Sequence, residues 1–356
     1  MNFQKRSNAL IRLGEVLDTI AGDVQHGRTD RGYQNAMHID FTRAISMAPQ
    51  KNPWFTMENI LYAMDANARM LSPEKVHSWT AYYDADKIAR EHMRNVGVIS
   101  AGNIPFVGLH DVLCTLMSGH RLILRPSGND AGLHQAILDL LVRIEPDLKS
   151  RIEIHESRLT GFDAVIATGS NNTLRYFDHY FRDYPHVFRK NRSGAAILKG
   201  DETDDDLKDL ADDVFRYYGL GCRNVSFLLL PGGFDTDRLF GNFLGWSRVQ
   251  ENHKYVNNYQ YYRTLYLLNR EKFLDNGFVM LKEDEHVHSP LSVLHYGYYQ
   301  DIPSVQAFLG NNAWEIQCVV SHMDGIPERV PFGRSQYPEL WDYADGIDTM
   351  DFLLNL

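Results

Sequence analysis

The sequence predicts an α/β protein with two domains, parallel or mixed sheets and a helical N-terminal region. From residue 94 onward, short β-branched runs alternate with helix-like segments, and a polar loop follows several of the runs. This alternation is typical of parallel βαβ units. A second such unit starts near Ala195–Leu198. A chain of 356 residues, of which 44% are hydrophobic, is long enough for two domains with substantial cores.

The individual elements follow from the spacing of apolar residues. Residues 3–20 and 54–71 carry apolar side chains at helical spacing, which predicts N-terminal helices. We expect strands at 96–100, 122–124, 152–154, 164–168, 195–198 and 225–230, and helices at 107–117 and 131–144. The Tyr-rich segment 255–268 has two interpretations, a wall that faces a ligand or ordinary strand and core packing.

The domain boundaries expected from these patterns lie near residues 194 and 330. We expect residues 1–194 to hold the N-terminal helices and a nucleotide-binding domain, and residues 195–330 to hold a catalytic domain. Residues 331–356 are too apolar for a loose tail, so they are expected to return to the core or to a subunit interface.

Charge and cysteine content exclude several classes of protein. The formal net charge of −10 argues against a nucleic acid as the main partner. The densest charge run, Asp201–Asp206, is expected to be a solvated helix start rather than a metal site. Three widely spaced cysteines form neither a disulfide framework nor a CxxC metal pair, so we expect no metal and a reducing compartment. Without a signal-like start or a membrane-length apolar run, the chain is expected to be cytoplasmic.

Cys222 lies in the glycine-rich segment Gly219-Leu-Gly-Cys-Arg-Asn-Val-Ser226, between an acidic amphipathic stretch and an apolar strand. Small neighbours would let an acyl group approach the sulfur, and the adjacent Arg223 would favour the thiolate, which is the nucleophilic form. Taken alone, a single cysteine is more often a small buried apolar residue.

Several short motifs occur in a characteristic order. Asn103-Ile-Pro105, Arg125-Pro-Ser127, Ala167-Thr-Gly-Ser170, Cys222 and Pro331-Phe-Gly333 resemble the Trp-Asn-Phe-Pro, Lys-Pro-Ser, Phe-Thr-Gly-Ser, cysteine and Pro-Phe-Gly motifs of the aldehyde dehydrogenase superfamily. Within it, Gly102–Asp111, Ser118–His120, Tyr218–Ser226 and Tyr337–Phe352 resemble the LuxC-type acyl-CoA reductases (fatty acid reductases). The resemblance covers residues 90–356 and implies an aldehyde dehydrogenase-like fold with two Rossmann-like sheet domains.

The resemblance also implies roles for individual residues. Cys222 would attack a thioester and hold the acyl group, while the Asn103 side chain and the Cys222 backbone N–H would stabilise the oxyanion. The nicotinamide cofactor would contact Arg125, Ser127, Thr168, Gly169, Ser170 and Glu285. Arg125 stands where the superfamily usually has lysine, and its guanidinium suits a 2′-phosphate, which favours NADPH while leaving NADH open.

One departure from the superfamily concerns its general base. The segment Val187–Gly194, where a glutamate is expected, contains no carboxylate. A hydrolytic enzyme needs a base to activate water, so this absence favours reduction of an acyl thioester over oxidation of an aldehyde. The acceptor of the Cys222 proton stays open, with His179 and His186 as candidates.

The leading prediction is therefore an NADPH-dependent reductase that converts a fatty acyl thioester, acyl-CoA or acyl carrier, into the aldehyde. Reduction of an acyl phosphate on the same fold and a non-catalytic acyl-binding scaffold are the alternatives. His286-x-His288 beside acidic residues is interpreted as a polar loop rather than a metal site. An acyl-activating protein partner and homo-oligomers are further expectations.

Overall fold

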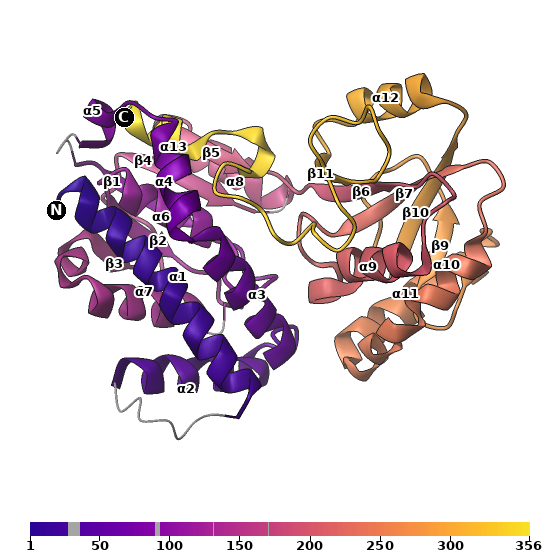
Figure 1. Cartoon of the computed structure of the whole chain (residues 1–356), viewed down its shortest axis with the longest axis horizontal. Coiled ribbons are helices and arrows are strands. Elements are labelled where there is room, and N and C mark those ends of the chain that lie inside the picture. The colour runs from indigo at the N-terminus through magenta and orange to yellow at the C-terminus, as the bar shows by residue number, and fades with distance from the viewer. Residues whose placement is uncertain (28–35, 90–92, 131, 170) are drawn as a thin grey trace. The chain divides into compact units, whose positions relative to one another are not determined.

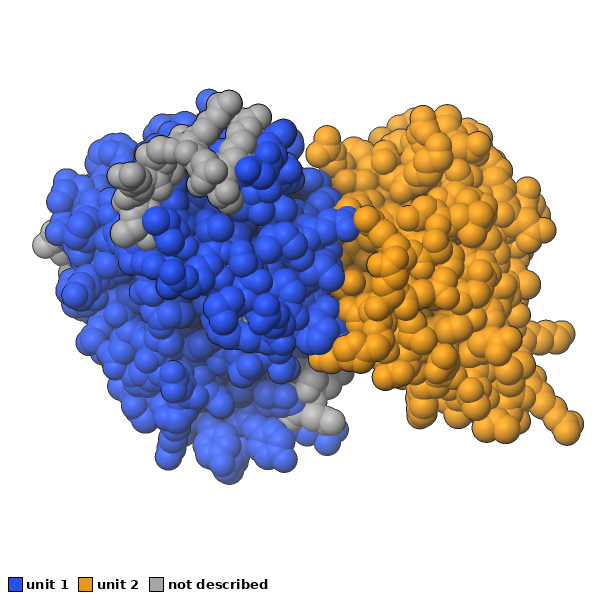
Figure 2. Space-filling model, turned by 90° about the horizontal axis from the view of Figure 1, so that it is seen from below, with its two compact units in different colours: residues 1–190, 337–356 blue, residues 191–336 orange. Residues whose placement is uncertain are grey.

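A computed structural model describes residues 1–27, 36–89, 93–130, 132–169 and 171–356. The chain forms two compact units, coloured separately in Figure 2: residues 1–190 with 337–356, and residues 191–336. The three domain ranges expected from the sequence remain predictions.

The first unit is built on a five-stranded sheet with the order β3-β2-β1-β4-β5. All its neighbouring strands are parallel. The bounds are β1 (Asn95–Ile99), β2 (Arg121–Arg125), β3 (Ile152–Ile154), β4 (Ala164–Thr168) and β5 (His186–Arg189). Because β1, β2 and β4 are neighbours, their carboxyl ends meet at one edge of the sheet.

Helices cover this sheet and form the N-terminal region (Figure 1). Side chains cap the starts of several of these helices, as with Asn2 before α1 and Thr56 before α3. The helices are α1 (Phe3–Gln25), α2 (Ala36–Lys51), α3 (Met57–Met70), α4 (Pro73–Ala81), α5 (Ala85–Ala89), α6 (Leu109–Met117), α7 (Leu133–Ile144), α8 (Asn171–Phe181) and α13 (Thr349–Leu354). Helices are thus confirmed for 3–20 and 54–71.

The second unit contains a seven-stranded mixed sheet with the order β12-β11-β6-β7-β10-β9-β8. Only the pair β8–β9 is antiparallel in this sheet. The bounds are β6 (Ser193–Ile197), β7 (Val225–Pro231), β8 (Leu274–Asp275), β9 (Met280–Glu283), β10 (Val293–Tyr299), β11 (Ile316–Val320) and β12 (Arg329–Val330). The predicted α/β class with parallel and mixed sheets is confirmed.

Within the second unit, helices lie on both faces of the sheet. Figure 1 shows α12 (Ile302–Asn311) on one side and α9 (Asp204–Phe215), α10 (Thr236–Phe243) and α11 (His253–Asn269) on the other. Val305 of α12 packs in a core cluster with Ala195, Ile197 and Phe227 of the central strands.

The strand interpretation of the Tyr-rich segment is wrong, because residues 253–269 form helix α11. Asn252 caps this helix by accepting a hydrogen bond from Lys254 N–H. Tyr255 and Tyr266 are buried, whereas Tyr261 and Leu268 are exposed. Aromatic and apolar side chains occur on all sides of the helix, so the sequence lacks the one-sided periodicity that identifies an amphipathic helix.

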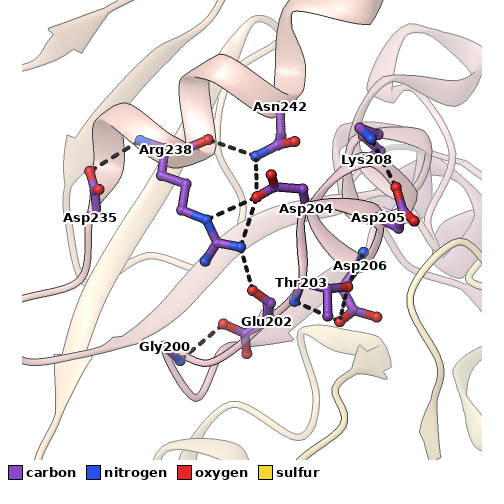
Figure 3. Close-up of polar contacts among 10 residues, drawn as sticks. All are labelled: Gly200, Glu202, Thr203, Asp204, Asp205, Asp206, Lys208, Asp235, Arg238 and Asn242. Atoms are coloured by element: carbon purple, nitrogen blue, oxygen red, sulfur yellow. Dashed lines mark hydrogen bonds and ion pairs between the residues drawn. The ribbon is translucent and has the colours of Figure 1, made fainter.

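The acidic run behaves as a helix start, as predicted. Thr203 caps α9 by accepting from Asp206 N–H, and the Asp206 carboxylate accepts from Thr203 N–H in return. Figure 3 shows that the Asp204 carboxylate also accepts from Arg238 of α10 at 2.8 Å. The first turn of α9 therefore places its carboxylates at the positive end of the helix dipole.

Residues 337–356 pack into the first unit. Leu340 and Leu353 are fully buried, and their carbonyls accept hydrogen bonds from His110 and His120 at 2.9 and 2.8 Å. Within the described ranges, no helix is both long and apolar enough to cross a bilayer.

Candidate active site

Cys222 lies in a tight turn directly before strand β7. Asn224 N–H donates to Gly221 O at 3.1 Å, and Gly221 N–H donates to the Asn224 side chain at 2.8 Å, so the turn closes on both sides of the cysteine. The Cys222 side chain is exposed, whereas Cys114 and Cys318 are buried, and none of the three forms a disulfide. The interpretation of Cys222 as a buried apolar residue is therefore wrong, and its thiol is accessible.

Asn224 anchors this turn to helix α9. Its side-chain amide donates to the carbonyls of Asp213 at 2.9 Å and Arg216 at 2.8 Å, near the end of the helix. Carbonyls in the last turn of a helix have no partner within the helix, so one buried amide satisfies two of them. Nothing in the sequence around Asn224 indicates this role except that the residue belongs to the same motif as Cys222.

A second anchor holds the residue after the cysteine. Arg223 Nε donates to Ser335 O at 2.5 Å, and the Asp213 carboxylate accepts from the backbone N–H groups of Gly333 and Ser335. The Pro331-Phe-Gly333 motif is thereby fixed beside the Cys222 turn. Burial raises the pKa of Asp213 to about 7.

Strand β6 approaches the turn closely because residue 194 is glycine. Gly194 N–H donates to Asn224 O at 2.7 Å, and a Cβ at position 194 would lie 2.7 Å from Arg223 O. Any larger residue would push β6 away from the cysteine turn.

In the first unit, Asn103, predicted to bind the oxyanion, and the predicted cofactor residues Arg125 and Thr168 lie at the carboxyl edge of the sheet. Asn103 lies in the loop after β1, Arg125 is the exposed last residue of β2, and Thr168 ends β4. The loops touch, because a Cβ at Gly102 would lie 2.8 Å from Ser127. The expectation that these loops share one rim is confirmed.

The remaining predicted residues are placed as follows. Gly169 directly follows β4, and a Cβ there would lie 3.0 Å from side chains of Thr173 and Phe177 in α8. Ser170 is outside the described residues. Glu285 is exposed in the loop between β9 and β10 of the second unit, the same unit as Cys222. The roles of all these residues remain predictions.

The two histidines considered as proton acceptors lie away from the rim of the first unit. His186 begins β5 and pairs with Val165, whereas the rim is at the other end of that strand pair, where Thr168 pairs with Arg189. His179 is exposed in the last turn of α8. In the segment without a carboxylate, Arg189 is buried and donates to Asp111 at 2.7 Å.

Comparison with solved structures identifies the fold. The fold is that of the aldehyde dehydrogenases. Aldehyde dehydrogenase 21 from Physcomitrella patens, in complex with its reaction product succinate, aligns with a TM-score of 0.66 at 12% identity over 97% of this chain and 84% of its own. An NAD-dependent aldehyde dehydrogenase from Sinorhizobium meliloti aligns with a TM-score of 0.61 at 15% identity over 92% of this chain and 71% of its own.

The family match is more specific. Residues 75–237 match the model of the acyl-CoA reductase (LuxC) family, so the resemblance seen in the sequence is confirmed for a segment that includes Asn103 and Cys222. Family and fold together support an oxidoreductase that acts on acyl groups. No curated protein sequence matches the chain significantly.

Proposed function

We propose that this protein reduces a fatty acyl thioester, acyl-CoA or an acyl carrier, to the aldehyde through an acyl group held on Cys222, with NADPH as the reductant. The observation that supports this most is the exposed Cys222 thiol on a doubly anchored turn within the segment that matches the LuxC family.

Acyl transfer needs a nucleophile with open access and a fixed backbone. The Cys222 sulfur forms a bond to the acyl carbon while the bond from that carbon to the carrier sulfur breaks, and the carrier leaves as a thiol after taking a proton. The Cys222 backbone N–H and the Asn103 side chain are assigned to the oxyanion. One such donor is typically worth about 3 kcal/mol in the transition state.

The rim of the first unit suits a dinucleotide. Its sheet is parallel and its polar loops lie beyond the carboxyl ends of the strands, which is where such sheets bind nucleotides. Gly102 and Gly169 stand where a side chain would collide with neighbouring groups, so these two loops pack closely at the rim. Arg125, Ser127, Thr168, Gly169, Ser170 and Glu285 are assigned to the cofactor, which supplies the hydride when bound.

The surroundings also favour aldehyde over free acid as the product. The segment 187–194 offers no carboxylate to activate water, and its buried Arg189 is engaged by Asp111. The acyl group on Cys222 therefore lacks the glutamate that would activate water in a hydrolytic enzyme of this fold. An acyl-activating protein that delivers the acyl group, and assembly into homo-oligomers, complete the proposal.

The test is oxidation of NADPH with acyl-CoA thioesters of graded chain length, with the aldehyde trapped by a hydrazine. We expect turnover in the wild type and in Cys318→Ala, the matched control for a buried thiol, and none in Cys222→Ala. Turnover that survives in Cys222→Ala would overturn the proposal. If Cys222 is acylated without turnover, the natural acyl donor is a protein-bound acyl group rather than acyl-CoA. If Cys222 is not acylated at all, the non-catalytic scaffold is favoured.

A further inference from the structure

One histidine of the second unit lies beside the strand that contacts the cysteine turn. His288 belongs to the loop between β9 and β10, and its Nδ1 lies 2.7 Å from Ser193 Oγ. Ser193 is the first residue of β6 and is 4% exposed, so its hydroxyl is a fixed partner for the imidazole.

Ser193 connects this histidine to Cys222 through adjacent backbone. Gly194, the next residue, donates its N–H to Asn224 O at 2.7 Å, and Asn224 closes the turn that contains Cys222. β6 and β7 are parallel neighbours, with Gly194 paired to Val225, so Ser193 and the cysteine turn are both at the amino end of this strand pair. A second contact holds the loop here, because Ser226 Oγ donates to Val287 O at 2.7 Å.

The imidazole has one nitrogen available for proton transfer. When Nδ1–H donates to Ser193 Oγ, Nε2 carries the lone pair that can accept a proton. His288 is partly exposed to solvent. Desolvation by the neighbouring protein atoms nevertheless lowers the pKa of His288, which favours the neutral imidazole at neutral pH.

Glu315 is the charged group that acts on His288, and the arginines next to Ser193 and Cys222 are held by backbone carbonyls. Glu315, whose carbonyl accepts from Ser193 N–H, opposes the burial effect and raises the pKa of His288. Arg192 precedes Ser193 and donates to Ala313 O and Ile316 O. Arg223 in the cysteine turn is held by Ser335, and the buried Cys318 thiol lies 4.0 Å from Arg223 O.

We propose that His288 is the group that accepts the Cys222 proton and that Ser193 is the residue that positions its imidazole. This inference rests on the proposed role of Cys222 as the nucleophile. The thiol S–H bond breaks as His288 Nε2 takes the proton, and the sulfur electron pair forms the bond to the acyl carbon. When the bond to the carrier sulfur breaks, the imidazolium returns the proton to the carrier thiolate, so His288 ends the step unchanged.

The experiment measures how fast iodoacetamide alkylates Cys222 between pH 5.5 and 10, followed by peptide mass spectrometry. We expect His288→Gln to react about tenfold or more slowly than the wild type at pH 7 and to approach it at the alkaline end. Ser193→Ala should also slow the alkylation of Cys222 at pH 7, but by a smaller factor. His286→Gln is the matched control, because His286 lies in the same loop with its Nδ1 on Asp284 at 2.7 Å.

If the wild type and a folded His288→Gln variant show the same dependence of alkylation rate on pH, His288 is not the acceptor of the Cys222 proton. If circular dichroism shows that His288→Gln has lost its fold, the profiles of His288→Asn and Ser193→Ala decide in the same way. Alkylation needs neither thioester nor NADPH, so the two proposals fail separately. A shifted profile without reductase turnover would end the proposed function alone, and turnover with an unshifted profile would end the role of His288 alone.

Discussion

Asp213 Oδ1 accepts a hydrogen bond from the backbone N–H of Ser335 at 2.9 Å, although 122 residues separate the two in the sequence. The other carboxylate oxygen accepts from Gly333 N–H at 2.7 Å. Both hydrogen bonds favour the ionised carboxylate, but burial outweighs them and raises the pKa of Asp213 to about 7. This carboxylate therefore changes charge near neutral pH while it holds the Pro331-Phe-Gly333 motif.

Asp213 is expected to make stability fall as the pH rises from 5 to 8. An unfolded aspartate titrates near pH 4, so between about pH 4 and 7 the folded state binds more protons than the unfolded state. The stabilisation is complete below the unfolded pKa and is lost as the pH rises through the folded pKa. Urea unfolding measures the free energy of unfolding of wild type and Asp213→Asn. Between pH 5 and 8, this free energy should fall by about 2 kcal/mol or more in the wild type relative to the variant.

The control is Asp205→Asn, which removes an exposed carboxylate from the same helix. The free energy of unfolding of this variant should differ little from that of the wild type, and the difference should hardly vary with pH. A difference between wild type and Asp213→Asn that stays constant from pH 5 to 8 would show that Asp213 titrates normally.

Asn224 should be the most sensitive residue of the cysteine turn. It is 2% exposed, and its side chain bonds to Asp213, Arg216 and Gly221. Asn224→Ala leaves these backbone groups without their partner, which should lower the free energy of unfolding by about 2–4 kcal/mol. Urea unfolding measures the loss.

Asn224→Asp separates the donor from the acceptor function. The carboxylate retains an acceptor for Gly221 N–H but cannot donate to the carbonyls of α9, so this variant should be destabilised as well. The control is Asn242→Ala at a half-buried position, which removes hydrogen bonds to Arg238 and Asp204 and should lower the free energy of unfolding by less than about 1 kcal/mol. Equal effects of Asn224→Ala and Asn242→Ala would refute the anchoring role.

Arg189 should be required for the stability of the first unit. Its guanidinium is 3% exposed and donates to Asp111 Oδ1, Thr349 Oγ1 and Ala344 O. Arg189→Met leaves the buried Asp111 carboxylate without its cation, at an expected loss of about 3–5 kcal/mol. Arg121→Met, which breaks the half-exposed pair with Glu153, should lose at most about 1 kcal/mol. Urea unfolding of the two variants would contradict this account if their midpoints shifted equally.

The sequence predicted β1 to β4 of the first sheet because each is a compact apolar run followed by a polar loop. It did not predict β5, whose short segment His186–Arg189 has only Val187 and Phe188 as apolar residues. Val96 and Val98 are buried in β1, and the loop with Asn103 follows that strand. Parallel pairing then forces the polar loops to one edge, so the rim could be predicted without knowledge of the strand order. Helix α11 could not be recognised in this way, because tyrosines occupy both exposed positions such as Tyr261 and buried positions such as Tyr266. The sequence therefore shows no separate polar and apolar faces.

The contacts that shape the cysteine turn could not be predicted, because they join residues far apart in the chain. Ser193 and His288 are 95 residues apart, and Arg223 and Ser335 are 112 apart. Contacts between residues so far apart in the sequence leave no local pattern from which they could be predicted. The motif order located Cys222, but only the sheet pairing of Gly194 with Val225 placed Ser193 beside the turn.

The choice between the two nicotinamide cofactors is expected to depend on Arg125. This residue is exposed at the end of β2, where the rim loops converge, and a guanidinium can bind a 2′-phosphate through two charged hydrogen bonds. Arg125→Gln should weaken binding of NADPH by roughly 10- to 100-fold, because it removes a charge-assisted contact worth about 1.5–3 kcal/mol. Binding of NADH should change little. Calorimetric titration of both cofactors against wild type and variant measures the two affinities, and Arg121→Gln, at the other end of the same strand, is the matched control. Equal weakening of NADPH and NADH, or a wild type that binds NADH more tightly, would assign Arg125 a role other than recognition of the 2′-phosphate.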